Sequence, residues 1–396
     1  MQIVLITDAY PPMKTSGAVQ IRDLVGELDR QGNKVTVLLP DSTISHHWQL
    51  DEQDNITVLR LKAPVTKDVS YFQRAIGEYL LSFFMFKNLK KSPLKDMNWD
   101  ALIWYSPTIF FGSLVKKIKA ESGCNSYLIL RDIFPEWAVD MGLLSRGMIY
   151  RYFKRVESFQ YMQGDTIGVQ TFSNLDYFHT EQKTFTGEMQ VLNNWLSVAQ
   201  IGDCRIRLND TSLSGRKIFI YTGNIGIAQG MDILIDLANE LRTDNNAGFV
   251  FVGRGTAVEK IKQKAKDYGL QNCLFFDEID PDEIPGLLAQ CHVGLVALDP
   301  RHRNDNIPGK FLAYMHAGLP VLANINAQND LERVINDNNV GKVVNDNSLE
   351  KLTQFARELS ADENDDPMVS ERCKALSASA FSSEAAVKQI IDALSK

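Results

Sequence analysis

The chain has 396 residues and a formal net charge of −7 at pH 7, and 44% of its residues are hydrophobic. Such a chain is long enough for two globular domains, and its acidic balance argues against a general nucleic-acid binder. Its five cysteines form no C-x-x-C pair, so we expect neither a zinc site nor a disulfide framework, and a reducing, cytoplasmic setting.

The first apolar run is short and is followed by Asp8. It therefore predicts a buried first strand, not a signal peptide. No apolar stretch reaches the roughly 18 residues that a transmembrane helix needs, so we expect a soluble or peripheral protein.

Short apolar runs alternate with helical patterns along the chain. In the first half they are Ile3–Ile6, Val35–Leu39, Ile56–Leu61, Ala101–Tyr105, Tyr127–Leu130 and Thr166–Val169. In the second half they are Ile218–Tyr221, Phe249–Val252, Leu274–Phe276, Val293–Leu298, Val321–Ala323 and Gly341–Val344. Continuous apolar strands separated by helices predict parallel sheets covered on both faces. A polar linker at 197–216 divides them, so we predict two doubly wound α/β domains, residues 1–200 and 201–382, followed by a last helix within 383–396.

Ligands of such sheets bind beyond the carboxyl ends of the strands, so the strand-to-helix loops are the candidate sites. In the first of these loops Tyr10 precedes two prolines, and Ser16 and Gly17 stand where a helix begins. Gly17 permits a close approach of a ligand to the backbone, although a plain helix cap explains the pattern equally well.

A second loop of the first half begins where a buried strand ends at Leu130 and runs directly into Arg131 and Asp132. Glu136 follows at the start of the next helix. Charged residues at the end of a buried strand lower stability unless they are used, which favours a functional site over an internal ion pair or a helix cap.

Two segments of the first half combine aromatic with basic side chains, residues 69–95 and residues 146–162. Basic amphipathic helices with aromatic residues suit an anionic membrane surface, so we expect peripheral membrane contact through these segments. A core helix that carries solvated lysines at its far end is the alternative for each of them.

The second half holds two glycine loops, each directly after a strand. Glycines allow tight turns that point backbone N–H groups toward a ligand. The second of these loops also places an arginine between two glycines, where it can meet a phosphate or stay in solvent. The candidate ligand-binding residues of the two loops are Gly223, Asn224, Gly226, Gln229 and Arg254.

The most informative stretch is 304–323, where a polar loop opens an apolar helix that ends at Gly318 before a short strand. The first turn of a helix leaves backbone N–H groups unpaired, and the helix dipole makes that end positive. Lys310 adds a full charge there, so the sequence predicts an anion site, most naturally for a phosphate. The candidate residues are Asp305, Asn306, Ile307, Pro308, Gly309 and Lys310.

Together these loops resemble the retaining glycosyltransferases of family 4 over essentially the whole chain. Within that family they are most similar to the bacterial N-acetylfucosamine-type transferases of surface-polysaccharide assembly, such as that of O-antigen, lipopolysaccharide or capsule. The resemblance implies the GT-B fold, in which two doubly wound Rossmann-like α/β domains face a central cleft. It also implies that the second domain binds the nucleotide sugar and that the last helix packs on the acceptor-binding first domain. The segments that carry it are Asp8–Gly17, Arg131–Trp137, Gly223–Gly230, Gly253–Gly255 and Ile307–Ala323.

Position by position, the chain departs from the family pattern. Asn224 and Gln229 stand where the family commonly has an arginine and a lysine. Asp305 and Ala313 stand where it has two glutamates, of which the second usually holds the donor ribose. The pair Arg131–Asp132 stands where many members have a catalytic histidine.

The resemblance implies transfer of a sugar, with retention, from a nucleotide diphosphate donor, UDP-linked, to a saccharide or polyprenyl-diphosphate-linked acceptor. It implies no required metal or other cofactor. Its catalytic residues would be Asp132, Glu136, Asp305 and Lys310. Gly17, the glycine loops and Asn306–Lys310 would contact the donor, and Tyr10, Ser16 and Arg131 would lie on the acceptor side. A nucleotide-sugar 2-epimerase of the same fold and a polysaccharide-assembly protein without activity are the alternatives.

Overall fold

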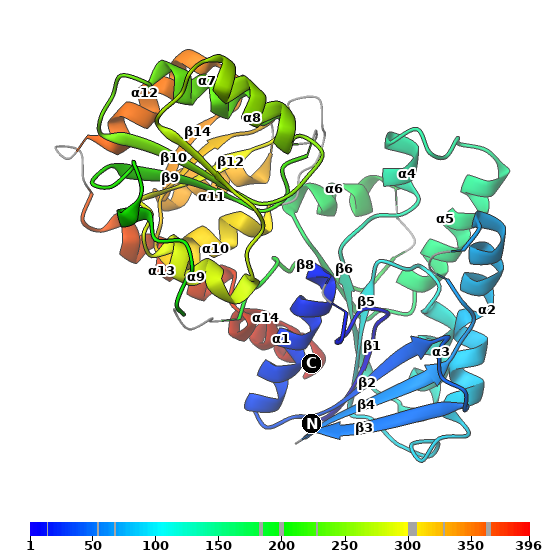
Figure 1. Cartoon of the computed structure of the whole chain (residues 1–396). Coiled ribbons are helices and arrows are strands. Elements are labelled where there is room, and N and C mark those ends of the chain that lie inside the picture. The colour runs from blue at the N-terminus through cyan, green and yellow to red at the C-terminus, as the bar shows by residue number, and fades with distance from the viewer. Residues whose placement is uncertain are drawn as a thin grey trace. The chain divides into compact units, whose positions relative to one another are not determined.

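The computed structural model describes residues 1–13, 15–53, 55–66, 69–181, 185–197, 202–226, 229–299, 307–327, 329–361 and 366–396 of the protein. The chain forms two compact units (Figure 1). The first comprises Met1–Asn193 and Ser383–Lys396, and the second comprises Asn194–Ser382. Each unit is built around a sheet of its own.

The sheet of the first unit has the strand order β3-β4-β2-β1-β5-β6-β7-β8 among the described residues. Its pairings are parallel except that of β3 with β4, so crossovers connect most of the strands. The strands are β1 (Gln2–Ile6), β2 (Lys34–Asp41), β3 (Trp48–Gln53), β4 (Ile56–Lys62), β5 (Ala101–Ser106), β6 (Asn125–Leu130), β7 (Thr166–Val169) and β8 (Glu188–Val191). The helices are α1 (Ser16–Arg30), α2 (Tyr71–Leu89), α3 (Gly112–Ser122), α4 (Glu136–Asp140), α5 (Met148–Tyr161), α6 (Phe172–Glu181) and α14 (Ser383–Leu394).

Local sequence signals set the limits of these helices. Ser70 and Gln73 form a capping box at the start of α2, which satisfies backbone N–H groups of its first turn. Gly123 ends α3 in the left-handed conformation, with φ of 64°, because a glycine adopts it without strain. The central strands are apolar throughout, since every residue of β5 and β7 is buried.

The C-terminal helix α14 belongs to the first unit and packs against α1 and β6. Asn125 Nδ2, at the start of β6, donates to the carbonyl of Leu394 (3.3 Å). Gln389 Nε2 donates to the carbonyl of Val191 (3.0 Å). The last residues of the chain are therefore part of the fold of its first half.

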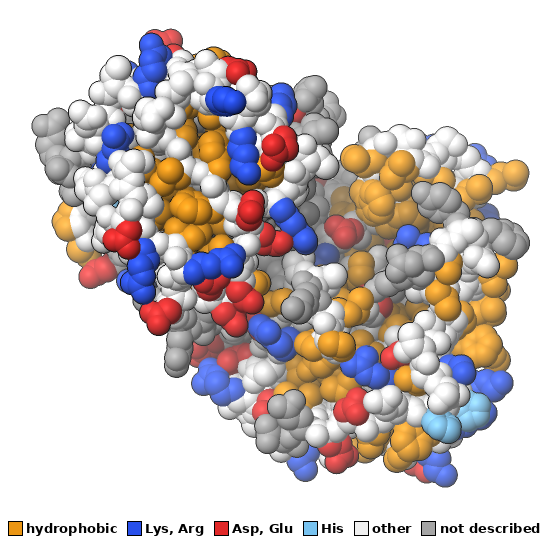
Figure 2. Space-filling model, in the orientation of Figure 1, with side chains coloured by type: hydrophobic (Ala, Val, Ile, Leu, Met, Phe, Trp, Pro, Cys, Tyr) orange, Lys and Arg blue, Asp and Glu red, His pale blue; other side chains and the backbone are white. Residues whose placement is uncertain are grey.

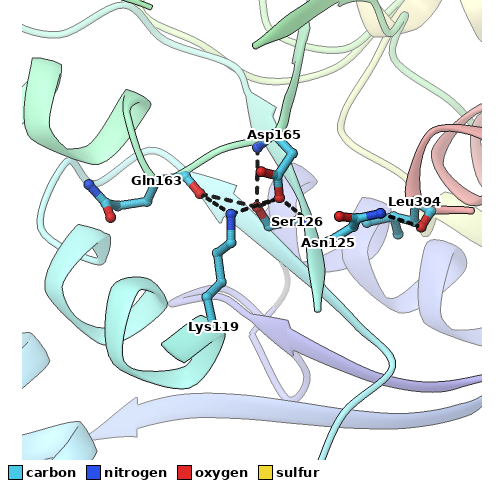
Figure 3. A network of polar contacts seen from close by, with 6 residues as sticks. All are labelled: Lys119, Asn125, Ser126, Gln163, Asp165 and Leu394. Atoms are coloured by element: carbon cyan, nitrogen blue, oxygen red, sulfur yellow. Dashed lines mark hydrogen bonds and ion pairs between the residues drawn. The ribbon is translucent and has the colours of Figure 1, made fainter. Parts of the chain in front are cut away.

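A polar network beside this contact joins the amino ends of β6 and β7 (Figure 3). Asp165 Oδ2 accepts hydrogen bonds from Ser126 Oγ (2.7 Å) and from Lys119 Nζ (2.7 Å). Lys119 Nζ and Ser126 Oγ also donate to the carbonyl of Gln163, at 3.0 and 3.1 Å. The network fixes the edge of the sheet that is opposite to the candidate site.

The sheet of the second unit is parallel throughout its described residues, with the order β11-β10-β9-β12-β13-β14. Helices from both sides bury it, and the fully buried Phe219, Phe249 and Phe251 lie in its centre. The strands are β9 (Lys217–Thr222), β10 (Ala247–Val252), β11 (Cys273–Phe276), β12 (Val293–Ala297), β13 (Val321–Asn324) and β14 (Gly341–Val344). The helices are α7 (Asp232–Glu240), α8 (Val258–Asp267), α9 (Ile284–Leu288), α10 (Gly309–Ala317), α11 (Asp330–Asn338), α12 (Leu349–Ser360) and α13 (Val369–Ala380).

The prediction of two doubly wound α/β sheets is confirmed, and each apolar run of the sequence coincides with a strand. The strands β3 and β8 were not predicted. Both lie at sheet edges, and their sequences, WQLDEQ and EMQV, lack a continuous apolar pattern, because an edge strand needs less apolar cover. No helix in the described part of the chain is long and apolar enough to cross a membrane.

Candidate functional site

Two loops lie side by side at the carboxyl edge of the second sheet, one after β9 and one after β10. Gly223 N donates to the carbonyl of Val252 (2.9 Å), and Ile225 N donates to that of Arg254 (2.8 Å). Gly253 has φ of 153°, and a Cβ at this position would lie 1.9 Å from the carbonyl oxygen of Gly223. Only glycine permits this approach, so the glycines of the sequence set the spacing of the loops.

Lys310 lies in the first turn of α10 and reaches the β9 loop. Pro308 is the N-cap of this helix. Lys310 Nζ donates to Tyr221 Oη (3.0 Å) and lies 4.4 Å from the centre of that ring. A Cβ on Gly223 would stand 4.0 Å from Lys310 Cε. A side-chain ammonium, a helix start and a glycine loop therefore converge at one place.

Burial lowers the pKa of Lys310 to about 8. Its partners in the described part of the chain are a hydroxyl group and an aromatic ring. A desolvated ammonium with neutral partners gains most from an anion, because the anion restores the interactions that the charge has lost with water. The electrostatics of this position thus favour a negatively charged ligand.

Two buried tyrosines hold this arrangement in place. Tyr221 is fully buried, and its Oη donates to the carbonyl of Asn224 (2.7 Å). Tyr314, on α10, accepts the backbone N–H of Thr222 at its Oη (3.2 Å). A Cβ on Gly294 would lie 2.3 Å from the Tyr314 ring, so α10 packs directly on β12. Lys310 is therefore presented by a helix that is fixed to the sheet.

We expected several polar side chains of these loops to bind a donor. In the structure these side chains form contacts with other protein groups. Gln229 Oε1 accepts hydrogen bonds from Asn224 Nδ2 (3.1 Å) and Gly226 N (3.0 Å). Arg254 is 81% exposed, and its Nε lies 3.1 Å from Glu278 Oε2. A ligand that used the Gly226 N–H would have to displace the Gln229 amide. The ion pair of Arg254 is at the surface, where such pairs contribute at most about 1 kcal/mol.

The other predicted residues of the 304–323 stretch differ in their environment. Asp305 and Asn306 lie outside the described residues. Ile307 is 6% exposed and packs in the core of the second unit. Gly309 is exposed, and no described atom comes within 4 Å of an ideal Cβ there. The helix ends at Gly318 in the left-handed conformation, as predicted.

The first unit places Tyr10, Ser16 and Gly17 in the loop after β1. Thr15 is the N-cap of α1, since its Oγ1 accepts a backbone N–H of the first turn (3.3 Å), and Ser16 is exposed. A Cβ on Gly17 would lie 3.0 Å from Tyr105 Oη. Gly17 thus lets the start of α1 approach the end of β5. Burial raises the pKa of Tyr10.

Arg131 and Asp132 have different environments at the end of β6. Arg131 is 7% exposed, its Nη1 donates to the carbonyl of Leu192 (2.9 Å), and burial lowers its pKa to about 10. Asp132 is exposed to solvent on one side, yet desolvation by the groups around it raises the pKa of its carboxyl, an effect that Arg131 opposes. Burial also raises the pKa of Tyr105, on which Arg131, Asp132 and Asp8 act electrostatically. Three strand ends therefore meet here.

Glu136 takes part in a polar network between α4 and α5. Tyr150 Oη donates to Glu136 Oε1 (2.7 Å), and Lys154 Nζ lies 3.1 Å from the same oxygen. Lys154 also pairs with Glu157 Oε2 (2.6 Å), whose side chain is fully buried. A substrate that approached Glu136 would compete with Tyr150 and Lys154.

Sequence reasoning missed several polar side chains at these strand ends. Tyr221, Tyr314 and Tyr105 stand within apolar runs or helices, where nothing distinguishes them from core aromatics. Asn324 and Asn326 are 1% and 7% exposed at the end of β13, and their Oδ1 atoms have no hydrogen-bond partner among the described residues. A usable signal was present for Asn324, since it is a polar residue directly after an apolar run.

The two sheet edges offer different chemistry. The edge of the second unit presents an ammonium, a helix start and close-packed glycine backbone, which suit a phosphate or diphosphate. The edge of the first unit presents a carboxylate with a raised pKa beside a buried guanidinium, which suits the hydroxyl groups of a sugar. The described residues hold no group of three or more His, Cys, Asp or Glu side chains that could bind a metal ion.

Comparison with known sequences identifies the class of protein. Residues 216–362, which lie within the second unit, match the family described as glycosyl transferases group 1. The chain is 26% identical over 215 residues to WbjE of Pseudomonas aeruginosa, whose name is that of a glycosyltransferase, and this alignment spans about half of either protein, 53% of each. It is 26% identical over 318 residues to WcaI of Escherichia coli (strain K12), whose name places it in colanic acid biosynthesis as a glycosyl transferase, over 74% of this chain and 76% of that protein.

Solved structures confirm the fold over the whole chain. Sucrose-phosphate synthase from Thermosynechococcus elongatus matches with a TM-score of 0.70 at 14% identity, over 99% of this chain and 98% of that one. WaaG, a glycosyltransferase involved in lipopolysaccharide biosynthesis, matches with 0.60 at 16% identity, over 99% of both chains. HepE of Anabaena, solved in complex with UDP and glucose, matches with 0.65 at 13% identity, over 100% of both chains.

The protein therefore has the GT-B fold, as the resemblance implied. Residues 216–362 are similar to the family described as glycosyl transferases group 1, and one relative, WcaI, is named for colanic acid biosynthesis. These findings support an enzyme of the glycosyltransferase class.

Proposed function

We propose that the protein is a retaining glycosyltransferase of family 4. It transfers an N-acetylated amino or deoxy sugar from a UDP-linked donor to a saccharide or polyprenyl-diphosphate-linked acceptor in bacterial surface-polysaccharide assembly. The observation that carries this proposal is the convergence of Lys310, the start of α10 and the β9 loop. The name of WcaI supports the polysaccharide setting, and the UDP bound to HepE supports the choice of nucleotide.

In the proposed reaction, the bond between C1 of the donor sugar and the diphosphate oxygen breaks, and the oxygen of an acceptor hydroxyl bonds to C1 from the same face. UDP leaves with the electron pair, and the hydroxyl proton passes to its diphosphate oxygen. Lys310 and the N–H groups of the first turn of α10 stabilise the charge that develops on the diphosphate. They do so without a metal ion, since the ammonium and the helix start supply the positive charge.

The first unit would contribute Asp132 to the same reaction. Its position at the end of β6 and its raised pKa suit a hydrogen bond to a sugar hydroxyl, and a carboxylate there also favours an oxocarbenium-like sugar. Arg131 and Tyr10 would border the acceptor. Glu136 would act on substrate only after release from Tyr150 and Lys154. Asp305 would contact the sugar hydroxyls or amide.

A lipid-linked acceptor would bring the enzyme to a bilayer. We therefore include in the proposal a peripheral contact with the inner face of the cytoplasmic membrane through residues 69–95 and 146–162. The basic and aromatic composition of these segments supports the contact.

A thermal-shift screen of nucleotide sugars against the purified protein tests the proposal most directly. A donor that binds the native state and is present at 100 times its Kd should add about 2.7 kcal/mol of stability. UDP-linked N-acetylated sugars should give the largest shift. Donors that shift the protein are then incubated with and without saccharide or polyprenyl-diphosphate acceptors, and NMR of the product reads the anomeric configuration.

Each alternative gives a distinct result in this screen. An epimerised sugar formed from donor alone would replace the proposal by a 2-epimerase. Binding without transfer or hydrolysis would favour an inactive assembly protein. An inverted product would contradict retention while leaving the class of enzyme intact.

A further inference from the structure

The loop after β1 is fixed at its two ends by threonine side chains. Thr7 Oγ1 accepts the backbone N–H of Ala9 (3.0 Å), and Thr15 caps α1. Between these points the chain turns, and Met13 N donates to the carbonyl of Tyr10 (3.2 Å). None of the four residues of this turn, Tyr10–Met13, is buried. The turn therefore presents Tyr10 at the carboxyl edge of the sheet without adding a side chain to the core.

An arginine of β4 contacts this turn. Arg60 Nη2 donates to the carbonyl of Pro11 (2.9 Å). Leu59 and Leu61, which flank it in β4, are fully buried, so the alternation of the strand sends Arg60 to the opposite face. Arg60 pairs in register with Leu39 of β2, one residue beyond the end of the pairing between β1 and β2. Its side chain thus meets the chain just after β1 has left the sheet.

Two carboxylates hold the guanidinium in this position. Asp51 Oδ2 on β3 lies 3.7 Å from Arg60 Nε, and Asp41 Oδ2 at the end of β2 lies 3.7 Å from Nη1. Thr43 fixes Asp41 in turn, since its N and Oγ1 donate to Asp41 Oδ1 (2.8 and 2.7 Å). Figure 1 shows β2, β4 and β3 side by side. Because the donors of a guanidinium point in fixed directions, the carboxylates near Nε and Nη1 orient Nη2 toward the Pro11 carbonyl.

The contact of Arg60 matters for the site more than for the core. A hydrogen bond from a charged donor is stronger than a neutral one, yet this bond restrains a turn that buries no side chain. Burial raises the pKa of Tyr10, an effect that Arg22 and Arg60 oppose, so the charge of Arg60 also acts on the Tyr10 phenol. Arg60 therefore restrains the backbone that presents Tyr10 and acts on its side chain.

We propose that Arg60 is a positioning residue for the acceptor side of the first unit. It holds the Tyr10–Met13 turn in place before an acceptor arrives, so that Tyr10 borders the acceptor without a rearrangement of the loop. If the turn were free, the apparent affinity for acceptor would fall to the fraction of time for which the turn is in place. Arg60 acts through the loop and does not touch substrate. The inference rests on the proposed function, because the acceptor is that of the proposed transferase.

Hydrogen exchange of the whole protein without substrate tests the hold on the turn. Arg60→Gln removes the charge and the forked donor group, whereas Arg60→Lys keeps the charge between the carboxylates and loses the fork. In both variants, peptides that cover residues 7–13 should exchange about fivefold faster than in the wild type, and peptides of the second unit should not change. Circular dichroism checks that each variant is folded. Arg60→Lys supplies the measurement if Arg60→Gln is not.

Steady-state kinetics with the donor and acceptor of the wild type test the role in the reaction. Arg60→Gln should raise the KM for acceptor about tenfold, because a charged hydrogen bond no longer holds the turn. The kcat and the KM for donor should change less than about twofold, since bound acceptor restores the turn and the second unit binds the donor. A general loss of structure would lower kcat instead.

A double-mutant cycle shows whether Arg60 acts through Tyr10. Tyr10→Ala removes the side chain that the turn presents and should itself raise the KM for acceptor. Arg60→Gln added to Tyr10→Ala should then change this KM less than about twofold further, because residues that act through one another are not additive.

Two control variants remove a positive charge from side chains whose described contacts lie outside the turn. Arg22 also acts on the phenol of Tyr10, but its described hydrogen bonds go to Asp23. Lys62 lies two residues after Arg60 in β4 and is exposed. Figure 2 shows Lys, Arg, Asp and Glu side chains over the visible face of this unit, so effects of general charge have to be separated. Arg22→Gln and Lys62→Gln should leave the exchange of the turn and the KM for acceptor unchanged.

Each part of the inference can be overturned separately. Unchanged exchange of residues 7–13 in both Arg60 variants would overturn the hold on the turn, whatever the activity. Faster exchange with an unchanged KM for acceptor would overturn the role in acceptor binding and leave the transferase intact. An equal rise of this KM in Arg22→Gln, or additive effects with Tyr10→Ala, would also overturn positioning through the turn. A wild type that transfers no sugar would remove the proposed function and the acceptor role with it, while hydrogen exchange would still decide whether Arg60 holds the turn.

Discussion

At the carboxyl edges of both sheets, loops lead from strands into helices, but the chemical groups that form the two edges differ. In the second unit, Gly223 and Gly253 bring two backbones into contact, and Lys310 arrives on the start of a helix. In the first unit, the edge is filled by side chains, and Arg131 is fixed by a hydrogen bond to the carbonyl of Leu192.

This difference indicates what each edge can recognise. A surface of backbone N–H groups and one ammonium suits the diphosphate of the proposed donor, which is the same in every nucleoside diphosphate sugar, and tolerates little change in shape. A surface of side chains can be altered residue by residue, which suits the proposed acceptor, since acceptors vary more between enzymes than the diphosphate does. Substitutions should therefore have different effects at the two edges.

The largest effect is expected for Lys310→Ala. Removal of one group that stabilises the developing charge typically costs about 2.7–4 kcal/mol, so turnover should fall at least about a hundredfold. The fold should persist, because the contacts of Lys310 with Tyr221 do not hold the core together. Steady-state kinetics and circular dichroism check both parts. Near-normal turnover would exclude the role of Lys310 in the leaving-group site.

Gly253→Ala should be the most damaging glycine substitution at this edge. A Cβ there would lie 1.9 Å from the carbonyl oxygen of Gly223, at a φ that other residues avoid. The free energy of unfolding should fall by about 3 kcal/mol or more in denaturant titrations. Gly309→Ala is the control: a Cβ at this position meets open space, so stability should change by less than about 1 kcal/mol. Similar losses in both variants would contradict a role for the close backbone contact.

The sequence predicts the fold well because each continuous apolar run between two helices marks a strand that is buried on both faces. It misses β3 and β8 because polar edge strands have no such pattern. The predicted helix start at 308–310 and its end at Gly318 are also confirmed, since proline, glycine and lysine at a helix start follow local rules that need no tertiary information.

Side-chain partners could not be predicted in the same way. The bond from Asn224 to Gln229 and that from Lys310 to Tyr221 depend on how loops fold back, which no local pattern encodes. The N-cap of α1 is Thr15 and not its neighbour Ser16, because backbone geometry decides between adjacent hydroxyl residues. Sequence therefore locates helix ends and strand-to-helix loops more reliably than it identifies the side-chain contacts within them.

Asp132→Asn and Glu136→Gln should separate the roles of two carboxylates in the first unit. Loss of a charged hydrogen bond to substrate costs about 1.5–3 kcal/mol, so Asp132→Asn should lower turnover about tenfold or more. Stability should not fall, because desolvation raises the pKa of this carboxyl and the neutral amide avoids that cost. Glu136→Gln should instead lower the free energy of unfolding by about 1–3 kcal/mol, because Tyr150 and Lys154 lose a charged partner. A stability loss in Asp132→Asn, with normal turnover, would assign Asp132 to the fold and not to the reaction.

The smallest effect is a pH dependence that belongs to the edge of the second unit alone. The pKa of Lys310 is about 8 in the folded chain, against an ordinary 10.5. Above pH 8 the free site loses its charge while a diphosphate favours the charged form, so donor affinity should fall about fivefold between pH 8 and pH 9. Without donor, the free energy of unfolding should instead rise with pH over this range. The unfolded chain keeps the Lys310 proton to higher pH than the folded chain does, so the contribution of Lys310 to stability rises between pH 8 and 10.5.

Calorimetric titration of the donor in buffers of different ionisation enthalpy should detect proton uptake near pH 8. Lys310→Arg stays charged over this range, so its donor affinity should not fall between pH 8 and pH 9. If the wild type and Lys310→Arg lose affinity alike, another group titrates. The ammonium would then not be the positive charge that distinguishes this edge from the edge built around Arg131, which stays protonated with a pKa of about 10.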